Sequence, residues 1–468
     1  MMTSVALVVF DGLRPDLIRP EVTPNLVRFA SVGGKMRRAH SVFPSETRVC
    51  TSSVATGCHP RRHGLVANLM FHPADPSRLV KTGDGDALRA LEQELGQAVL
   101  QRPGLSDILA AAGHDFTVFS SGTTGQTFLL APRADRLGQI VISAHGPHFT
   151  SIAGQTVLAK LSPPPAEAAA RAIWIADAWR TTMLPSPPAA SVIWLCEPDT
   201  SQHYEGLDTP AARNTLREVD AAFGRILDDW QSGPHRDTLQ IIVASDHGHI
   251  MVDGHVDVRA AFAALPALAG CHVGGGGIMV PSGERARIAE VAYVLMRQHW
   301  IGQVFASDIA DLPAGALPNS AALVDHTRAG HVLYTLRNGA KSGPTGLLGT
   351  TLIEADSELK LGAGTHGGMN AGELSTVLML AGSLIHSGVA SDWPAGLVDI
   401  APTLLAALGV EGDFGMDGRV LRETFLDRVD PTDSLTPETW EASGEDYAQR
   451  VARVRIGRHV WLESGSRV

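Results

Sequence analysis

Short runs of consecutive aliphatic residues recur along the chain and predict buried β-strands. The runs are Val5–Phe10, Phe116–Ser120, Val192–Cys196, Leu239–Ala244 and Thr376–Leu380. Apolar residues are continuous in these runs rather than alternating with polar ones. Both faces of each strand should therefore be covered, as they are in a parallel sheet.

Longer segments between these runs carry apolar residues three and four positions apart, which is typical of amphipathic helices. The clearest are Leu105–Ala112, Ala166–Met183, Ala211–Trp230 and Val398–Leu408. Strands that alternate with helices predict the α/β class. We expect a doubly wound, mostly parallel sheet flanked by helices, with an inserted smaller α+β cap domain.

The pattern also suggests how the 468 residues are divided. Residues 1–253 form the first part of the α/β core, and residues 365–410 form its last part. Residues 254–364 are predicted to be the inserted cap, because they contain a glycine run and a helix-like segment around Glu284–His299. Residues 411–468 are a C-terminal extension, richer in Asp, Glu, Arg and Pro, whose end shows no clear periodicity.

Charge and composition narrow the classes of partner. The chain has 38 basic and 49 acidic residues, a formal net charge of −11. With no lysine-rich tract, this excludes electrostatic wrapping of long nucleic acid or of an anionic membrane. The four cysteines include no CxxC pair, so they predict neither a disulfide framework nor a zinc clip. We see no signal peptide and no apolar stretch of about 18 residues, and therefore expect a cytoplasmic protein without a membrane span.

Candidate metal ligands follow three of the predicted strands. Asp11 comes directly after the first run, and Asp246 and His247 follow the fourth. Asp199 and His203 follow the third run four residues apart, so one helical turn would bring both onto the same face. Open α/β sheets place their sites at the carboxyl ends of strands. A loop cap explains any one of these residues by itself, but not their joint occurrence.

His366 adds another imidazole in the small-residue loop Thr365–Gly368. Three aspartates and three histidines in four separate loops match the ligand chemistry of two divalent ions, and carboxylate with imidazole suits zinc, manganese or iron. Two such ions about 3.5–4 Å apart stabilise the attacking and leaving oxygens of a displacement at phosphorus. The set therefore favours phosphoryl transfer.

The segment Phe43–Gly57 supplies candidate nucleophiles. It resembles a loop that enters a helix, which places hydroxyl groups and free backbone amides at the positive end of that helix. Such a combination of hydroxyl and amide groups binds phosphate.

Together these motifs resemble the alkaline phosphatase superfamily, and in particular its nucleotide pyrophosphatase/phosphodiesterase branch. The residues that carry the resemblance are Asp11-Gly12, Thr47, Thr56-Gly57, Pro60, His63-Gly64, Asn68, Glu197-Pro198-Asp199, His203, Asp246-His247-Gly248, His366-Gly367 and the segment Val398–Val410.

The resemblance implies two divalent metal ions, preferably Zn²⁺ and otherwise Mn²⁺ or Fe, with Thr47 as a nucleophile that bridges or adjoins them. It also implies that Asn68 binds the phosphoryl oxygen that faces no metal, because 68 minus 47 is 21, the spacing of that branch. Ser45 is the alternative nucleophile, although it breaks this spacing. The implied ligands are Asp11, Asp246 and His247 for one ion, and Asp199, His203 and His366 for the other.

The implied activity is hydrolysis of phosphodiester or pyrophosphate bonds in small molecules through a covalent threonine intermediate. Several residues depart from the branch: Arg48 replaces the usual phenylalanine, Val49-Cys50 replaces Pro-Asn, and His249 stands where methionine is more common. Arg48 would meet a carboxylate or second phosphate of the substrate, or would be a structurally paired arginine.

Two other functions stay open at this stage. One is a carbon–phosphorus hydrolase resembling phosphonoacetate hydrolase, and the other is an inactive metal-binding interaction module. The expected partner is a small phosphorylated or phosphonate substrate, and assembly into a homo-oligomer also stays open.

Overall fold

Parallel strands form the middle of the main sheet. The computed structural model describes residues 3–281, 283–307 and 311–468. Its nine-stranded sheet has the order β18–β2–β19–β8–β1–β7–β5–β6, with β20 also paired to β2. Strands β8, β1, β7, β5 and β6 are mutually parallel, as the continuous apolar runs predict. The bounds are β1 (Ser4–Phe10), β2 (Gly34–His40), β5 (Phe116–Ser120), β6 (Ile140–Ser143), β7 (Ala190–Leu195), β8 (Leu239–Ala244), β18 (Ser375–Thr376), β19 (Leu378–Ala381) and β20 (Ala390–Gly396).

The run Thr376–Leu380 differs from the prediction of one continuous strand. It is divided at Val377 into β18 and β19, which pair antiparallel with their neighbours. Thr376 and all of β19 are buried, so the apolar content of the run is explained by its position beside β2 and β8. A run of apolar residues indicates burial but not strand direction.

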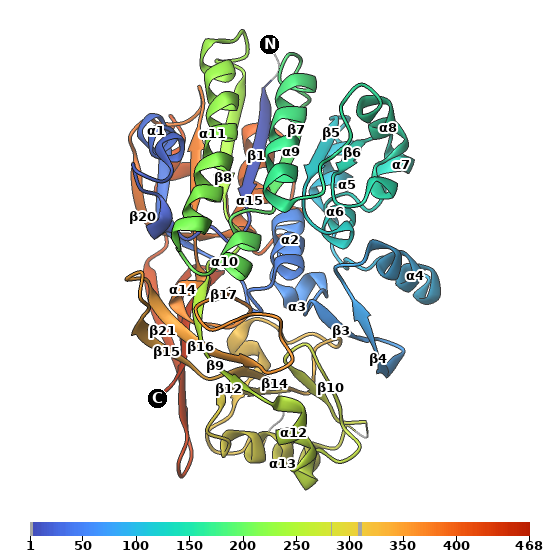
Figure 1. Cartoon of the computed structure of the whole chain (residues 1–468), viewed down its shortest axis with the longest axis vertical. Coiled ribbons are helices and arrows are strands. Elements are labelled where there is room, and N and C mark those ends of the chain that lie inside the picture. Colours follow the sequence, from blue (N-terminus) through green and yellow to red (C-terminus); the bar gives the residue numbers. More distant parts are fainter. Residues whose placement is uncertain (1–2, 282, 308–310) are drawn as a thin grey trace.

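Helices cover both faces of this sheet (Figure 1). Leu7 and Val9 of β1 pack in one hydrophobic cluster with residues of α2, α5 and α15. Val8 and Phe10 point to the opposite side, into a cluster with residues of α9 and α11. This period-2 division explains why β1 is apolar throughout. The helix bounds are α1 (Pro24–Val32), α2 (Thr47–Thr56), α3 (Pro60–His63), α4 (Gly85–Leu95), α5 (Leu105–Ala111), α6 (Thr124–Leu130), α7 (Ala134–Leu137), α8 (Ile152–Leu158), α9 (Ala168–Thr182), α10 (Asp199–Glu205), α11 (Pro210–Ser232) and α15 (Ile400–Ala407).

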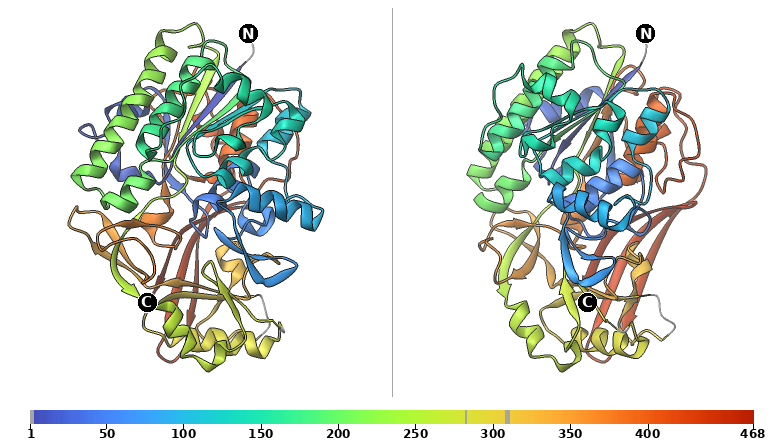
Figure 2. Two further views of the ribbon diagram at one scale, coloured as in Figure 1. Left: turned by 45° about the vertical axis from the view of Figure 1, so that its right-hand side comes forward. Right: turned by 90° about the vertical axis from the view of Figure 1, so that its right-hand side faces the viewer.

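Two smaller sheets lie below the main one in Figures 1 and 2. One has the order β10–β11–β14–β12–β13 and packs with helix α13, and the other has the order β15–β16–β9–β17. Strand β9 crosses the predicted boundary between residues 253 and 254. The division of the chain into a core and a cap remains a prediction. The bounds are β9 (Ile250–Val256), β10 (His272–Gly274), β11 (Gly277–Met279), β12 (Ile301–Ala306), β13 (Leu317–Pro318), β14 (Val332–Leu336), β15 (Asn338–Ser342), β16 (Leu348–Glu354), β17 (Gly364–Thr365), α12 (Val258–Ala263), α13 (Arg285–Met296) and α14 (Ala371–Leu374).

The C-terminal segment forms an antiparallel sheet of three strands. These are β21 (Leu435–Ser443), β22 (Ala448–Ile456) and β23 (His459–Arg467). Val454 and Trp461 are buried in the same cluster as β1 and α15, and the Trp461 indole N–H donates a hydrogen bond of 2.8 Å to Asp399. The segment is therefore packed into the protein core.

Replacing Trp461 by phenylalanine tests this packing. The variant keeps an aromatic ring but removes the N–H that Asp399 Oδ2 accepts deep in the core. We expect the free energy of unfolding to fall by about 1–3 kcal/mol, because a buried acceptor loses a donor. Urea unfolding followed by circular dichroism measures this. A change below about 0.5 kcal/mol, the level of an ordinary surface substitution, would contradict the assigned role of the indole.

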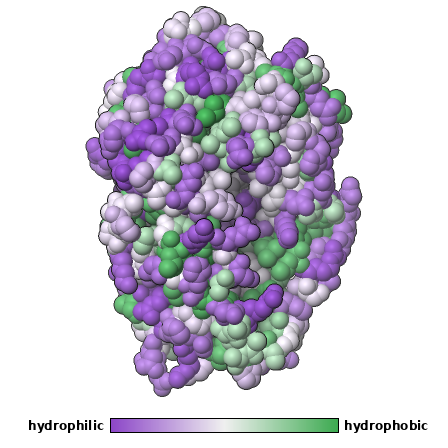
Figure 3. Space-filling model, in the orientation of Figure 1, coloured by the Kyte–Doolittle hydropathy of each residue, from purple (hydrophilic) through white to green (hydrophobic). Residues whose placement is uncertain are grey.

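The face of the molecule seen in Figure 3 is mainly polar. The space-filling view shows hydrophilic residues over most of this face, with hydrophobic ones in separate patches and a hollow near the centre (Figure 3). Within the described parts of the chain, every helix is too short or too polar to cross a membrane.

Candidate active site

Three carboxylates meet where three parallel strands end. Strands β8, β1 and β7 are neighbours, so the loops after them lie at one edge of the sheet. Asp11 follows β1, Asp246 follows β8, and Asp199 begins α10 just after β7. Backbone hydrogen bonds tie these loops together: the Asp199 N–H donates to the Asp11 carbonyl at 3.0 Å, and the Gly12 N–H donates to Asp246 Oδ1 at 3.0 Å. The convergence expected from the sequence is therefore present.

Asp11, Asp246 and His247 form the first cluster, which is fully buried. The Trp194 indole donates to Asp11 Oδ2 at 2.8 Å, and the N–H groups of Gly12 and His247 both donate to Asp246 Oδ1 at 3.0 Å. The other two oxygens, Asp11 Oδ1 and Asp246 Oδ2, are buried and have no hydrogen-bond partner among the residues that the structure describes. Each lies 3.4 Å from His247 Nε2. Three potential ligand atoms thus face one point.

The electrostatics of the first cluster favour a cation. Burial, and then the neighbouring charge of Asp11, raise the pKa of Asp246 well above its usual value. Burial alone would lower the pKa of His247, but the charges of Asp246 and Asp11 raise it to about 10. Ligands about 2.0–2.2 Å from one ion at tetrahedral angles lie about 3.3–3.6 Å apart, and the two distances of 3.4 Å from His247 Nε2 fall in this range. The residues therefore fit a divalent ion.

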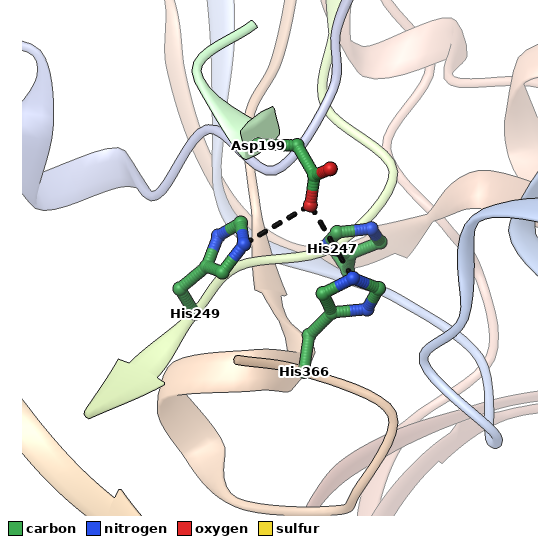
Figure 4. Close-up of side chains that lie close together, drawn as sticks. All are labelled: Asp199, His247, His249 and His366. Atoms are coloured by element: carbon green, nitrogen blue, oxygen red, sulfur yellow. Dashed lines mark hydrogen bonds and ion pairs between the residues drawn. The ribbon is translucent and has the colours of Figure 1, made fainter. Parts of the chain in front are cut away.

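Asp199 is the centre of the second cluster. Its Oδ1 lies 3.1 Å from Nε2 of His203, 3.1 Å from Nε2 of His249 and 3.3 Å from Nε2 of His366. Figure 4 shows the rings of His249 and His366 directed at this carboxylate, with His247 beside them. The rings of His247 and His366 are stacked with centroids 3.5 Å apart, so the two clusters adjoin.

Thr47 is the first residue of α2, and its side chain faces the first cluster. Its Oγ1 lies 3.3 Å from His247 Nε2, and the residue is only 7% exposed. Asn68 lies beside the same helix end: its side-chain Oδ1 accepts a hydrogen bond from the Arg48 N–H, and its own N–H donates to the Glu46 carboxylate. Burial raises the pKa of that carboxyl group. A hydroxyl, an amide side chain and a helix N-terminus therefore surround the edge of the cluster.

Ser45, the alternative nucleophile, is engaged elsewhere. Its hydroxyl donates to the Gly368 carbonyl at 2.9 Å and accepts from the Gly367 N–H at 3.0 Å. The Ser45 carbonyl accepts a hydrogen bond of 2.7 Å from His366 Nδ1. Ser45 therefore holds the His366 loop in place.

Arg48 lies outside both clusters. A Cβ atom on Gly83 would lie 3.8 Å from Arg48 Nε, so the guanidinium adjoins the loop after β4 (Asp75–Lys81). This Nε is buried and has no hydrogen-bond partner among the described residues. Burial raises the pKa of the nearby Glu46 carboxyl group, and the positive charge of Arg48 opposes this rise. Contact of Arg48 with a substrate therefore remains a prediction.

Three residues near the site were not predicted from the sequence as parts of it. His249 lies in the second cluster, Glu46 contacts Asn68, and Trp194 orients Asp11. The motif Asp246-His247-Gly248-His249 carries a detectable signal, because His249 follows the same strand as two predicted ligands. Trp194 lies inside an apolar strand and gives no such signal.

Comparisons with known proteins show the family of this chain. Residues 5–297 match the family model described as type I phosphodiesterase / nucleotide pyrophosphatase. Bis(5'-adenosyl)-triphosphatase enpp4 of Xenopus laevis is 26% identical over 247 residues, which are 52% of this chain and 47% of that protein. Ectonucleotide pyrophosphatase/phosphodiesterase family member 7 of Homo sapiens is 24% identical over 56% of this chain and 51% of its own length. The chain thus spans about half the length of the curated relatives it matches.

Solved structures share the fold. Murine ectonucleotide pyrophosphatase/phosphodiesterase 5 superposes with a TM-score of 0.59 and 18% identity, over 87% of this chain and 95% of that one. The human protein of the same name gives 0.59 and 16%, over 90% and 100%. The fold class is confirmed, and so is the resemblance seen in the motifs. The family model covers more than half of the residues, so this chain belongs to the type I phosphodiesterase / nucleotide pyrophosphatase family, within the alkaline phosphatase superfamily.

Proposed function

We propose that this protein is a two-metal-dependent hydrolase of phosphodiester or pyrophosphate bonds in small molecules, with Thr47 as a covalent nucleophile. One observation carries the proposal: Thr47 Oγ1 lies 3.3 Å from His247 Nε2, at the edge of the buried carboxylate and imidazole clusters. A hydroxyl placed beside cation ligands at a helix N-terminus is suited to attack phosphorus.

The residues divide into two ligand groups. Asp11, Asp246 and His247 would hold one ion, and the group around Asp199 with His203 and His366 would hold the other. Bound there, two divalent cations, with Zn²⁺ preferred and Mn²⁺ or Fe possible, would lower the pKa of the Thr47 hydroxyl and stabilise charge on the attacking and leaving oxygens. Two such ions contribute +4, against −3 from three carboxylates. A monoanionic diester can therefore approach although the whole protein is acidic.

Thr47 carries the covalent step. Its oxygen forms a bond to phosphorus while the bond from phosphorus to the leaving oxygen breaks, and the leaving alcohol or phosphate takes up a proton. Water then cleaves the bond between phosphorus and Thr47 Oγ1, which releases a phosphomonoester and restores the hydroxyl. Two displacements of this kind replace one direct attack by water.

Asn68 and the start of α2 would stabilise the charge that builds on phosphorus oxygens. The backbone amides at the start of a helix and the Asn68 amide are fixed before the reaction, so they stabilise that charge without reorganisation. Asn68 is neutral, and a single phosphoryl charge therefore suits the site better than a dianion. This favours diesters over monoesters.

The relatives support the same reading. One is named bis(5'-adenosyl)-triphosphatase, and another solved structure is described as an inactive threonine-to-alanine variant of murine ectonucleotide pyrophosphatase/phosphodiesterase 5 in complex with AMP. An inactive threonine variant and a bound nucleotide in that protein are consistent with Thr47 as nucleophile and with a small phosphorylated substrate here.

Metal-stripped protein tests the proposal directly. We expect hydrolysis of bis-p-nitrophenyl phosphate to disappear after chelation and to return with Zn²⁺ or Mn²⁺, with slower turnover of p-nitrophenyl phosphate. Faster release of phosphate from phosphonoacetate than from either ester would favour the carbon–phosphorus hydrolase. No turnover of any substrate in the metal-loaded protein would favour the inactive interaction module.

Arg48→Ala should change substrate preference. Arg48 Nε has no hydrogen-bond partner among the described residues, and the guanidinium would bind a second anionic group of the substrate. A hydrogen bond to a charged group contributes about 1.5–3 kcal/mol. We therefore expect kcat/KM for a pyrophosphate-linked dinucleotide to fall about 10-fold or more. Hydrolysis of bis-p-nitrophenyl phosphate should change little. Steady-state kinetics measure kcat/KM on both substrates, with Arg61→Ala, at an arginine on α3, as the matched control. Equal losses of kcat/KM on both substrates would contradict the proposed role of Arg48.

A further inference from the structure

We propose that His249 is a fourth protein ligand of the ion held at Asp199, in addition to His203 and His366. The inference rests on the proposed function, because it assumes that the Asp199 cluster binds a cation. Methionine is more common at this position in the branch that the sequence resembles, so the ligand would be a property of this chain. It would change how that ion is held.

Hydrogen-bond direction identifies the free nitrogen of each ring. His249 Nδ1 lies 3.0 Å from the Gly12 carbonyl, and a carbonyl can only accept, so Nδ1 carries the proton. A neutral imidazole then presents a lone pair at Nε2. This Nε2 faces Asp199 Oδ1 at 3.1 Å, and that oxygen is also an acceptor. Two acceptors at this distance repel each other unless a cation or a proton lies between them.

His203 and His366 have the same arrangement. His203 Nδ1 donates to the Gly364 carbonyl at 2.7 Å, and His366 Nδ1 donates to the Ser45 carbonyl at 2.7 Å. Both therefore turn Nε2 toward Asp199, as His249 does. Backbone carbonyls that fix the tautomer of metal-binding histidines are a general feature of metal sites. His249 thus makes the same pair of contacts as His203 and His366, and it lies with Asp199 and His366 in one group of potential ligand atoms within 4.8 Å of one another.

The chain holds the His249 ring firmly in this orientation. A Cβ atom on Gly12 would lie 2.3 Å from His249 Cε1, and one on Gly364 would lie 3.1 Å from Cδ2, so the ring fits between two glycines. Gly12 also has a φ of +72°, which glycine adopts readily. Arg14 Nη1 donates to the His249 carbonyl at 2.6 Å. The ring is completely buried, so its nitrogens make no hydrogen bonds to bulk solvent.

A fourth protein ligand has a chemical consequence. Catalytic zinc sites commonly use three protein ligands and keep one position for water or substrate, whereas four ligands close a tetrahedral site. Substrate would then have to enter as an additional ligand. The site would bind its ion more tightly. It would also favour ions that readily take more than four ligands.

Proton NMR of the Co²⁺-loaded wild-type protein counts the imidazole ligands without any variant. Each histidine that binds paramagnetic Co²⁺ through Nε2 keeps an exchangeable proton on Nδ1, whose signal moves far outside the normal range. We expect four such signals, from His203, His247, His249 and His366, and all four should vanish in D₂O. Three signals would overturn the proposal.

Two variants assign the fourth signal and separate ligation from hydrogen bonding. In His249→Gln the amide can still donate to Asp199, whereas in His249→Met it cannot. We expect both variants to lose one shifted signal and to bind the second Zn²⁺ at least about 100-fold more weakly in competition with a chromophoric chelator, beyond the upper end for loss of a supporting residue. His255→Gln, at an exposed histidine on β9, is the matched control and should behave as wild type.

The outcomes separate this inference from the function on which it rests. Wild-type affinity in His249→Gln, with weakened binding only in His249→Met, would show that His249 merely donates to Asp199 and would overturn the inference alone. A wild-type protein that hydrolyses diesters with two bound ions and shows three signals would do the same. Failure of the wild-type protein to bind metal at all would overturn both.

Discussion

Thr47→Ala is expected to lower kcat for bis-p-nitrophenyl phosphate by about 10⁴-fold or more, with the fold and the metal content preserved. The substitution removes the oxygen that we propose forms the covalent bond to phosphorus, and loss of a nucleophile has effects of this size in other covalent hydrolases. Thr47 lies at the first position of α2, so alanine should not disturb the helix. Stopped assays at high protein concentration, with metal analysis of the same samples, measure the residual rate.

Two companion variants make the result specific. Thr47→Ser keeps a hydroxyl and should retain measurable turnover. Ser45→Ala should reduce activity only through the His366 loop, because the Ser45 hydroxyl bonds Gly367 and Gly368. If Thr47→Ala kept more than about a tenth of the wild-type rate while Ser45→Ala abolished it, Ser45 would be the nucleophile and the account would be wrong.

Asp246→Asn should have opposite effects on the metal-free and the metal-loaded protein. Without metal, Asp246 Oδ2 is buried, has no hydrogen-bond partner in the described part of the chain and lies near the like charge of Asp11. A neutral amide removes this repulsion, so we expect the metal-free variant to be more stable by about 1–3 kcal/mol. With metal, the variant lacks a charged ligand, and activity should fall by about 100-fold or more.

Thermal unfolding with and without Zn²⁺ separates these effects. A ligand that binds only the folded state raises its stability in proportion to the logarithm of its concentration over Kd. Excess Zn²⁺ should therefore raise the wild-type melting temperature much more than that of Asp246→Asn. Asp253→Asn, an exposed aspartate on β9, is the matched control. A metal-free variant less stable than wild type would contradict the argument from charge repulsion.

Sequence patterns predicted the main sheet well because burial on both faces leaves a simple signal. The predicted bounds of β5 and β8 agree with the structure at every residue, and those of β1 and α5 differ by one residue. The C-terminal strands were not predicted, because β21 is largely exposed and polar, and its pairing with β22 depends on residues from both strands. The antiparallel direction of β19 is likewise a tertiary property that the run Thr376–Leu380 does not encode locally.

The candidate site was predictable where ligand-type residues follow strands. Asp11, Asp199 and Asp246 follow neighbouring strands, so topology alone brings them together. His249 was not predicted as a ligand, because its role depends on the glycines that admit its ring and on the carbonyl that orients it. Trp194 was also missed, since a tryptophan within an apolar strand is explained equally well by core packing.

Anomalous diffraction from a crystal of the Zn²⁺-loaded protein tests the central claim most directly. We expect two zinc peaks, one contacted by Asp11, Asp246 and His247 and the other by Asp199, His203 and His366. Thr47 Oγ1 should be turned toward both peaks. A single peak, peaks away from these residues, or a Thr47 hydroxyl directed elsewhere would contradict it.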